Sequence, residues 1–282
     1  MTVKIVTDST SDIPADVAER LDITVVPLNI HFGTDNYKDN VTISADEFYS
    51  RLATSSTLPK TSQPSPGDFK EIYDELGANA DAIVSIHVSA KLSGTYNSAV
   101  QAAAQTSAKC PIEIVDSEQV SMGLGLTAIA LAGAANNGAS MEEITGVAQD
   151  TKMRAQVIGL CETLEYLEKG GRIGKAQSLV GSVLKIKPMI IVKDGEIHEL
   201  GKGRTFAKSV IKLKEAARRF SPIDSLSVIY STTPEVALEI ADELKDMLPP
   251  GVDPYLTRFG PVIGTYAGPG AIGIAVIQSV SE

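Results

Sequence analysis

The chain has 282 residues, enough for two domains or one large one, and its 43% apolar and 21% charged residues are typical of a folded globular protein. A net charge of −10 argues against binding to nucleic acid or to an anionic membrane surface, since both rely on Lys and Arg. With 5% aromatics and no Trp, base-stacking platforms are not expected. The chain starts directly on a strand pattern, without a leader or an apolar span, so we predict a cytoplasmic protein without membrane insertion.

The first half alternates strand and helix patterns. Residues 3–6 read as a strand that runs into a hydroxyl-rich turn, and a short helix with Pro14 in its first turn follows. Residues 23–33 read as extended, and residues 36–40 as the return arm of a hairpin. Further strands are predicted at 82–88 and 112–115, and helices at 44–53, 65–77, 122–135 and 140–155.

Three of these helices have clear start signals. Ser44 with Glu47, and Ser140 with Glu143, have the spacing of capping boxes, in which each side chain bonds the other residue's backbone N–H. Ser65 caps a helix whose first position is Pro66, and Gly77 ends it. Strand–helix alternation of this kind predicts parallel pairing with right-handed crossovers.

The second half has a different pattern. Asp194 and Gly195 between two alternating runs predict a β-hairpin over residues 187–204. The remaining predictions are strands at 156–162 and 226–230, helices at 164–171, 176–184, 206–220 and 234–248, and a terminal strand region interrupted by glycines at 261–278. We therefore predict an α/β protein with a doubly wound parallel-sheet domain at residues 1–155 and an α+β domain at residues 156–282.

Several familiar catalytic or metal-binding patterns fail on spacing. GGRIGKA at residues 170–176 lacks the spacing and the final hydroxyl of a phosphate-binding P-loop, so we interpret it as a glycine-rich helix stop. Ser93 lacks the G-x-S-x-G context of a hydrolase nucleophile, and we expect nearby His87 to be a hydrogen-bonded core histidine. We expect Asp8 to cap a turn and Asp12 to cap the first helix, rather than to bind magnesium.

The other titratable candidates give no metal site either. Three histidines without regular spacing do not predict a zinc site, so no metal is expected. Cys110 and Cys161 are interpreted as buried thiols, although one disulfide is compatible with their number.

Two hydroxyl-rich turns suggest a site for a small anion. Thr61 and Ser62 lie in an extended segment between two prolines, and Ser93 precedes a predicted helix. A helix N-terminus offers unpaired N–H groups to an anion, and the carboxyl ends of parallel strands are where ligands bind in such sheets. This reasoning leaves two interpretations open: an anion site formed by Thr61, Ser62 and Ser93, or simple helix capping by these residues.

The motifs, taken together and in order, resemble the bacterial DegV family of lipid-binding proteins. The matching stretches extend from Thr7 to Gly273, so the resemblance covers nearly the whole chain. They are TDSTSDIP, VPLNIHFG with Tyr37 and Asp39, TSQPSPGDF, IHVSAKLSGTYNSA, VDSEQVSMGLG, LEYLEKGGRIGKAQSLVGSVLKIKPMIIVKDGEI and GPVIGTYAGPGAIG.

The resemblance implies a function. It predicts that an apolar tunnel between two domains encloses one long-chain fatty acid, whose carboxylate meets Thr61 and Ser93, with Ser62 beside them. It further implies a non-catalytic component of a fatty acid kinase, without a cofactor, that presents its ligand to a separate ATP-binding kinase subunit and then carries the acyl phosphate. The alternative, from fold-level likeness, is the substrate-binding subunit of a kinase for a small, dihydroxyacetone-like hydroxyketone.

Three further residues are assigned through the resemblance. The family usually has His where this chain has Tyr266; a phenol still donates a hydrogen bond to the carboxylate but does not become a cation near neutral pH. We expect hydrogen bonding to be sufficient there. Arg172 and Arg204 match basic positions of the family pattern and are predicted to contact the phosphate or the kinase partner, whereas a solvated arginine at the end of a helix remains an equal alternative for Arg172.

Overall fold

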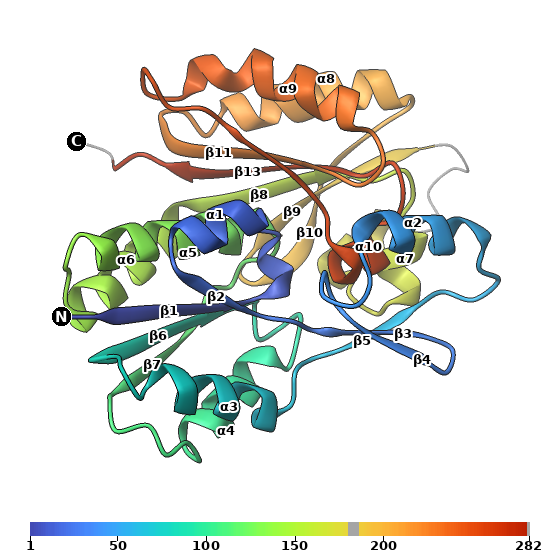
Figure 1. The fold of residues 1–282 in the computed structure, drawn as a ribbon. Coiled ribbons are helices and arrows are strands. Elements are labelled where there is room, and N and C mark those ends of the chain that lie inside the picture. The colour runs from blue at the N-terminus through green and yellow to red at the C-terminus, as the bar shows by residue number, and fades with distance from the viewer. Residues whose placement is uncertain (180–185, 281–282) are drawn as a thin grey trace.

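A computed structural model describes residues 1–179 and 186–280. Its elements stack in layers: a parallel sheet, a middle layer of helices and a mixed sheet, with a helix pair on the outer face of each sheet (Figure 1). The predicted α/β class, with a parallel sheet followed by a separate mixed sheet, is confirmed.

The first sheet is wholly parallel, with the strand order β2-β1-β6-β7. All six residues of β6 are buried, as expected for a strand covered by helices on both faces. The strands are β1 Val3–Asp8, β2 Ile23–Val26, β6 Ala82–His87 and β7 Ile112–Asp116.

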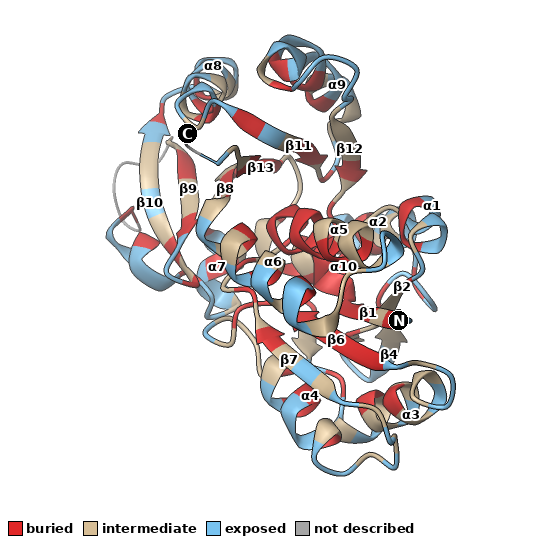
Figure 2. Ribbon diagram, turned by 90° about the vertical axis from the view of Figure 1, so that its left-hand side faces the viewer, coloured by how far each residue is buried: buried red, intermediate tan, exposed pale blue. Residues whose placement is uncertain are grey.

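Helices cover both faces of this sheet. One pair, α3 and α4, packs on the outer face, whereas α5 contacts both β1 and β13 of the second sheet. Because α5 is covered from both sides, its sequence is apolar all round, and Figure 2 shows it buried along most of its length. The helices are α1 Ala15–Arg20, α3 Pro66–Leu76, α4 Thr95–Ala103, α5 Met122–Asn136 and α6 Met141–Arg154. Among the described residues, no helix combines the length and apolarity needed to cross a membrane.

The predicted helix starts are confirmed at Ser65 and Ser140, and in part at Ser44. Ser140 forms the predicted capping box with Glu143, and Ser65 forms one with Asp68. Ser44 accepts the N–H of Glu47, but the Glu47 carboxylate lies 3.4 Å from Arg51 and pairs with it instead of completing a box.

The prediction that Asp12 caps the first helix is wrong. The residue before α1 is Pro14, which provides no side-chain cap. Asp12 instead ends a 3₁₀ turn, and its carboxylate accepts hydrogen bonds from Ser121 and the Gly260 N–H, which belong to other elements. Asp8 does cap that turn, by accepting the Thr10 N–H at 3.1 Å.

A small antiparallel sheet, with the order β4-β3-β5, lies beside the first. Its hairpin confirms the predicted return arm, and its third strand holds the segment with Thr61 and Ser62 extended, in register with Ile30 and Asn29. The strands are β3 Asn29–Phe32, β4 Asp35–Lys38 and β5 Lys60–Ser62, and helix α2 Ala45–Thr54 lies between β4 and β5 in the chain.

The second large sheet is mixed, with the order β10-β9-β8-β13-β11-β12. Its predicted hairpin is confirmed, and both Asp194 and Gly195 have the positive φ that such a two-residue turn requires. The strands are β8 Ala155–Leu160, β9 Lys187–Lys193, β10 Glu196–Gly203, β11 Ile223–Tyr230, β12 Tyr255–Arg258 and β13 Ile272–Gln278. Its outer face is covered by α8 Phe206–Arg218 and α9 Pro234–Leu244.

The prediction of a strand region over residues 261–278 is wrong for its first part. Pro261–Ala267 form α10, because Pro261 occupies the first helical position after Gly260 and Gly268, with φ of 72°, ends the helix. The predicted helix 164–171 is present as α7 Glu165–Lys169. Of the predicted helix 176–184, the described part belongs to the 3₁₀ turn Gly174–Leu179, and the remainder lies outside the described residues.

The two large sheets are built from different parts of the chain. The parallel sheet uses strands that end by Asp116, and the mixed sheet begins with Ala155. The predicted division into residues 1–155 and 156–282 stays a prediction, because α5 packs against strands of both sheets.

Candidate functional site

The ends of neighbouring parallel strands meet on one cavity. Thr10 follows β1, Ser93 follows β6 and Ser121 follows β7, and all three line the same space. Ligands bind at this edge of open parallel sheets because the strand-end loops and helix N-termini converge there. Three hydroxyls therefore line the cavity at this edge of the sheet, and of these Ser93 is the predicted site residue.

Thr61 and Tyr266 meet at the cavity although 205 residues separate them. Strand β5 holds the Thr61 side chain toward α10, and its Oγ1 lies 2.5 Å from the Tyr266 Oη. Gly170 makes room for this arrangement, because a Cβ there would lie 2.5 Å from the Tyr266 ring. Two hydroxyls that bond each other retain lone pairs, and one proton can turn toward an incoming anion.

Ser93 lies directly before α4. Its Oγ accepts the Thr95 N–H at 3.3 Å and is 2.9 Å from the Thr95 hydroxyl. A Cβ on the neighbouring Gly94 would lie 2.8 Å from Gln63 Nε2, so the absence of a side chain there lets the two predicted loops approach each other. The structure thus brings Thr61 and Ser93 into one cavity wall, as the sequence predicts.

Ser62 also lines the cavity, but its hydroxyl is occupied. The Oγ lies 3.2 Å from Asn29 Nδ2 and 3.0 Å from His31 Nε2. Because side chains alternate along a strand, Ser62 points away from the direction that Thr61 takes. If Ser62 binds an anion, it does so through its backbone.

Arg172 contributes the positive charge of the site. Its Nε donates to the Leu92 carbonyl at 3.2 Å, and its guanidinium carbon lies 5.3 Å from the centre of the Tyr266 ring. Arg172 also borders a second, polar cavity with Lys91 and Ser93. Arg204 is different: it is exposed between β10 and α8 and lines neither of these two cavities.

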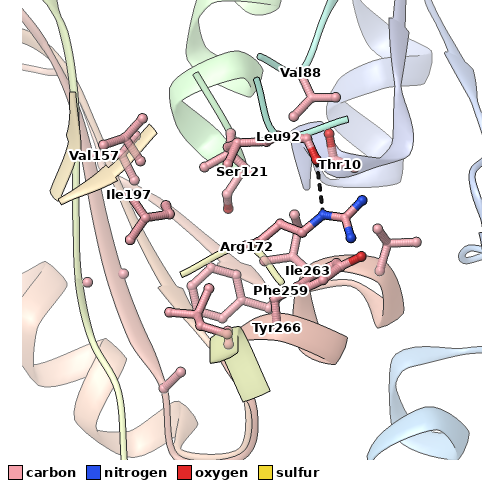
Figure 3. A pocket seen from close by; sticks show the side chains of 18 of the residues that line it. Thr10, Val88, Leu92, Ser121, Val157, Arg172, Ile197, Phe259, Ile263 and Tyr266 are labelled. Atoms are coloured by element: carbon pink, nitrogen blue, oxygen red, sulfur yellow. Dashed lines mark hydrogen bonds between the residues drawn. The ribbon is translucent and has the colours of Figure 1, made fainter. Parts of the chain in front are cut away.

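The cavity contains about 990 Å³ of space free of protein atoms, counting its opening to solvent. Figure 3 shows Arg172 and Tyr266 on one side, with Val157 and Ile197 on the sheet side across from them. Most of the other lining residues are aliphatic or aromatic. They include Leu160 of β8, Leu167 of α7, Ile190 and Val192 of β9, Phe259 directly after β12, Val262 and Ile263 of α10, and Ala271 directly before β13. An apolar space with a few convergent polar groups is typical of a site for an amphipathic ligand.

Thr10, Gln63 and Ser121 were not among the predicted site residues. Thr10 and Ser121 follow strands in hydroxyl-rich segments, so the reasoning that identified Ser93 applies to them too. Gln63 lies in the same restrained segment as Thr61. The apolar wall carries no comparable sequence signal, since its residues resemble those of any core.

A buried hydrogen-bond network lies behind the cavity wall. His87 is fully buried, with Nδ1 3.0 Å from Asp8 Oδ2 and Nε2 2.7 Å from Ser85 Oγ. Ser85 in turn accepts from the Tyr73 hydroxyl and is itself buried, so it is not placed to attack a ligand. The prediction of a hydrogen-bonded core histidine is confirmed.

Two buried carboxyls lie at the start of α10. Burial raises the pKa of Asp39 from 3.8 to about 7, although the Ser9 hydroxyl and the Val262 amide moderate the shift. Neither Asp39 oxygen has a hydrogen bond of normal geometry. Burial also raises the pKa of Asp12 well above its usual value, against the opposing effect of its bonds from Ser121 and Gly260.

Among residues 1–179 and 186–280, no group of three or more His, Cys, Asp and Glu side chains is arranged to hold a metal ion. Cys110 and Cys161 are free thiols. Cys161 is buried in the cavity wall, and burial raises the pKa of its thiol to about 12; Cys110 is only half-buried.

Comparison with known proteins identifies the family. The DegV family model, described as an uncharacterised protein family, matches residues 2–279. The chain belongs to the DegV family. A DegV domain-containing protein of Streptomyces coelicolor is 38% identical over 278 residues, covering 97% of this chain and 98% of the relative. Protein DegV of Bacillus subtilis is 34% identical over 279 residues, covering 97% and 98%.

Solved structures of proteins described as binding fatty acids share the whole fold. A Thermus thermophilus member described as binding fatty acid superposes with a TM-score of 0.91 at 31% identity, over 99% of this chain and 100% of that one. Bacillus subtilis DegV, described as a fatty acid binding protein, gives 0.88 at 33% identity, with the same coverage. A stearic acid-binding protein of Eubacterium ventriosum gives 0.90 at 29% identity, over 98% of each chain.

Proposed function

We propose that this DegV-family protein binds one long-chain fatty acid, with the carboxylate at Thr61, Ser93 and Tyr266 and the acyl chain in the apolar cavity. Ser62 lies beside the carboxylate and contributes through its backbone. The observation that carries the proposal is the division of the cavity lining: the partly exposed hydroxyls of Thr61, Ser93 and Tyr266 lie near Arg172, and most of the remaining lining is apolar. That division matches the two ends of a fatty acid.

The apolar lining favours this ligand over a small hydroxyketone. A molecule of that kind exposes hydroxyl and carbonyl groups on all sides, and each would need a partner when it is buried. A buried acyl chain needs none, and it gains about 0.8 kcal/mol for each methylene removed from water. Relatives described as binding fatty acids have the same fold, which supports this choice.

We further propose that the protein is the acyl-binding component of a fatty acid kinase in the cytoplasm. A separate ATP-binding subunit would phosphorylate the carboxylate, and this chain would carry the acyl phosphate without a cofactor or a catalytic residue of its own. Arg172 lies beside Tyr266, where a guanidinium suits a phosphate. Exposed Arg204 suits a contact with the partner subunit.

Mass spectrometry of the intact protein tests the first proposal. Protein purified under native conditions is expected to carry about one equivalent of a fatty acid, because an apolar cavity of this kind retains its ligand. Extraction followed by a return of stearate should restore the same mass. Failure of the extracted protein to bind any fatty acid would contradict the proposal.

A kinase assay tests the second proposal. With a cognate ATP-binding subunit, Arg204→Ala is expected to bind stearate as the wild type does but to form acyl phosphate more slowly. Lys208→Ala, which removes an exposed charge at the start of α8, is the matched control. Loss of stearate binding in Arg204→Ala would place that residue in the lipid site or the fold and refute its role in docking.

A further inference from the structure

Two glycines face each other in the sheet wall of the cavity. In the antiparallel pairing of β8 with β13, Gly273 lies opposite Gly159, and both line the cavity. Side chains alternate along an extended chain, so these positions lie on the same sheet face as Val157 on β8 and Ala271 directly before β13, which also line the cavity. Large side chains, Ile190 and Ile229, come from the strands on either side.

Gly273 determines where the Phe259 ring lies. A Cβ on Gly273 would be 2.8 Å from Phe259 Cζ and 3.2 Å from Ile229 Cδ1, both too close for unstrained contact. Ile229 is fully buried. The Phe259 backbone is held by bonds to Tyr230 and Tyr49, so its ring would have to turn, and it already lines the cavity.

Gly159 acts on the space directly. A Cβ there would be 3.4 Å from Ile190 Cγ1 and 3.6 Å from the Ile272 carbonyl, which is ordinary contact. An alanine at this position therefore fits without displacing its neighbours, and its methyl group would occupy part of the cavity. None of the polar side chains that line the cavity is among the atoms nearest to either Cβ position.

We propose that the Gly159–Gly273 pair sets the length of acyl chain that the cavity accepts. Because Gly273 has no side chain, the Phe259 ring can pack against the sheet. Because Gly159 has no side chain, the space that a larger residue would fill stays part of the cavity. The inference rests on the proposed function, in which the carboxylate is fixed by Thr61, Ser93 and Tyr266 and the apolar wall that contains the two glycines contacts the acyl chain. Larger side chains at these two positions would narrow the apolar part of the cavity. The narrowed cavity would exclude the methyl end of a long acyl chain but still admit a short acyl chain.

The test compares the affinities of delipidated protein for stearate and for the shorter laurate. Gly273→Ala is expected to weaken stearate binding about tenfold and to leave laurate binding within about twofold. The displaced Phe259 ring would occupy space that the longer acyl chain of stearate needs and that the shorter chain of laurate does not reach. Gly159→Ala should change the stearate-to-laurate ratio in the same direction. Gly146→Ala, in an exposed part of α6 with no atom within 4 Å of its Cβ position, is the matched control.

A second substitution separates the cavity effect from a general loss of packing. Leucine lacks the ring atoms that approach Gly273, so Phe259→Leu in the Gly273→Ala background is expected to restore the wild-type ratio. An equal weakening of both ligands, or no rescue by Phe259→Leu, would refute the role of Gly273. An unchanged ratio in Gly159→Ala would refute the role of Gly159, even if Gly273→Ala failed to fold. If the wild type bound neither fatty acid, the proposed function itself would fall.

Discussion

The Thr61 and Ser93 hydroxyls give the first prediction at the scale of single residues. A hydrogen bond to a charged group contributes about 1.5–3 kcal/mol, so Thr61→Val combined with Ser93→Ala should weaken stearate binding by more than tenfold. Neither side chain is in the fully buried core, so the protein should remain folded. Calorimetric titration of delipidated protein measures the change.

The matched control for this double variant is Ser50→Ala with Thr54→Val, which removes the same groups from the exposed surface of α2. It should bind stearate as the wild type does. Equal affinity of the Thr61/Ser93 variant and this control would show that the carboxylate binds elsewhere.

Tyr266 gives the second prediction. Its hydroxyl bonds Thr61, while its ring lies beneath the Arg172 guanidinium. Tyr266→Phe keeps the ring and removes only the hydroxyl, so a loss of acyl-phosphate formation with a cognate kinase would isolate the hydrogen bond. We expect wild type and Tyr266→His to turn over equally and Tyr266→Phe to be slower.

The histidine variant also tests the opposite view. A large gain in Tyr266→His would mean that the site needs a group that becomes a cation near neutral pH, and that this chain has moved toward storage or transport of fatty acid. The matched control is Tyr255→Phe, which also removes one phenol hydroxyl. Tyr255 lies on β12 and does not line the fatty-acid cavity.

At the scale of elements, helices with local start signals could be predicted from the sequence. Ser65 and Ser140 cap their helices through residues three positions on, and Asp194 with Gly195 form their turn through their own backbone angles. These signals need no distant partner, so a single sequence contains them.

Helix α10 shows where local reasoning fails. Its residues are mostly apolar, like those of the strand that follows, glycines lie at both of its ends, and Pro261 at its first position is the main local sign of a helix. What holds it in place is distant in sequence: Asp12 binds the Gly260 N–H, and the Tyr49 hydroxyl binds the Phe259 carbonyl. The role expected of Asp12 failed for the same reason, because its partners lie more than 100 residues away.

The residues of the candidate site likewise differ in whether local sequence signals could predict them. Thr61 and Ser93 could be proposed from the sequence because hydroxyl-rich turns follow predictable strands and loops. Tyr266 came only from a family pattern, since its approach to Thr61 depends on the placement of α10. The size of the cavity could not be predicted at all, because it depends on the register that sets Gly159 opposite Gly273.

At the scale of the whole molecule, two buried carboxyls lie where the parallel-sheet region meets the start of α10. Asp12 follows β1 of the parallel sheet, and its bonds reach α5 and the start of α10. A Cβ on Gly260 would lie 3.2 Å from Asp12 Oδ1 and 3.4 Å from Asp39 Oδ1, so both carboxyls flank that junction. Their protonation should therefore affect global stability.

Asp39 gives the last prediction. Its pKa is about 3.8 when exposed and about 7 in the fold, so between these values the folded state binds more protons than the unfolded state. The free energy of unfolding should fall as pH rises through this interval, and the loss is complete above pH 7. Asp39→Asn keeps a neutral side chain at every pH, so urea unfolding should show the variant more stable than the wild type by a few kcal/mol at about pH 8, with the difference much reduced at about pH 5. Asp16→Asn, on the exposed face of α1, should show no such change. A destabilisation of Asp39→Asn that is equal at both pH values would mean that the ionised carboxylate is the form that the fold requires.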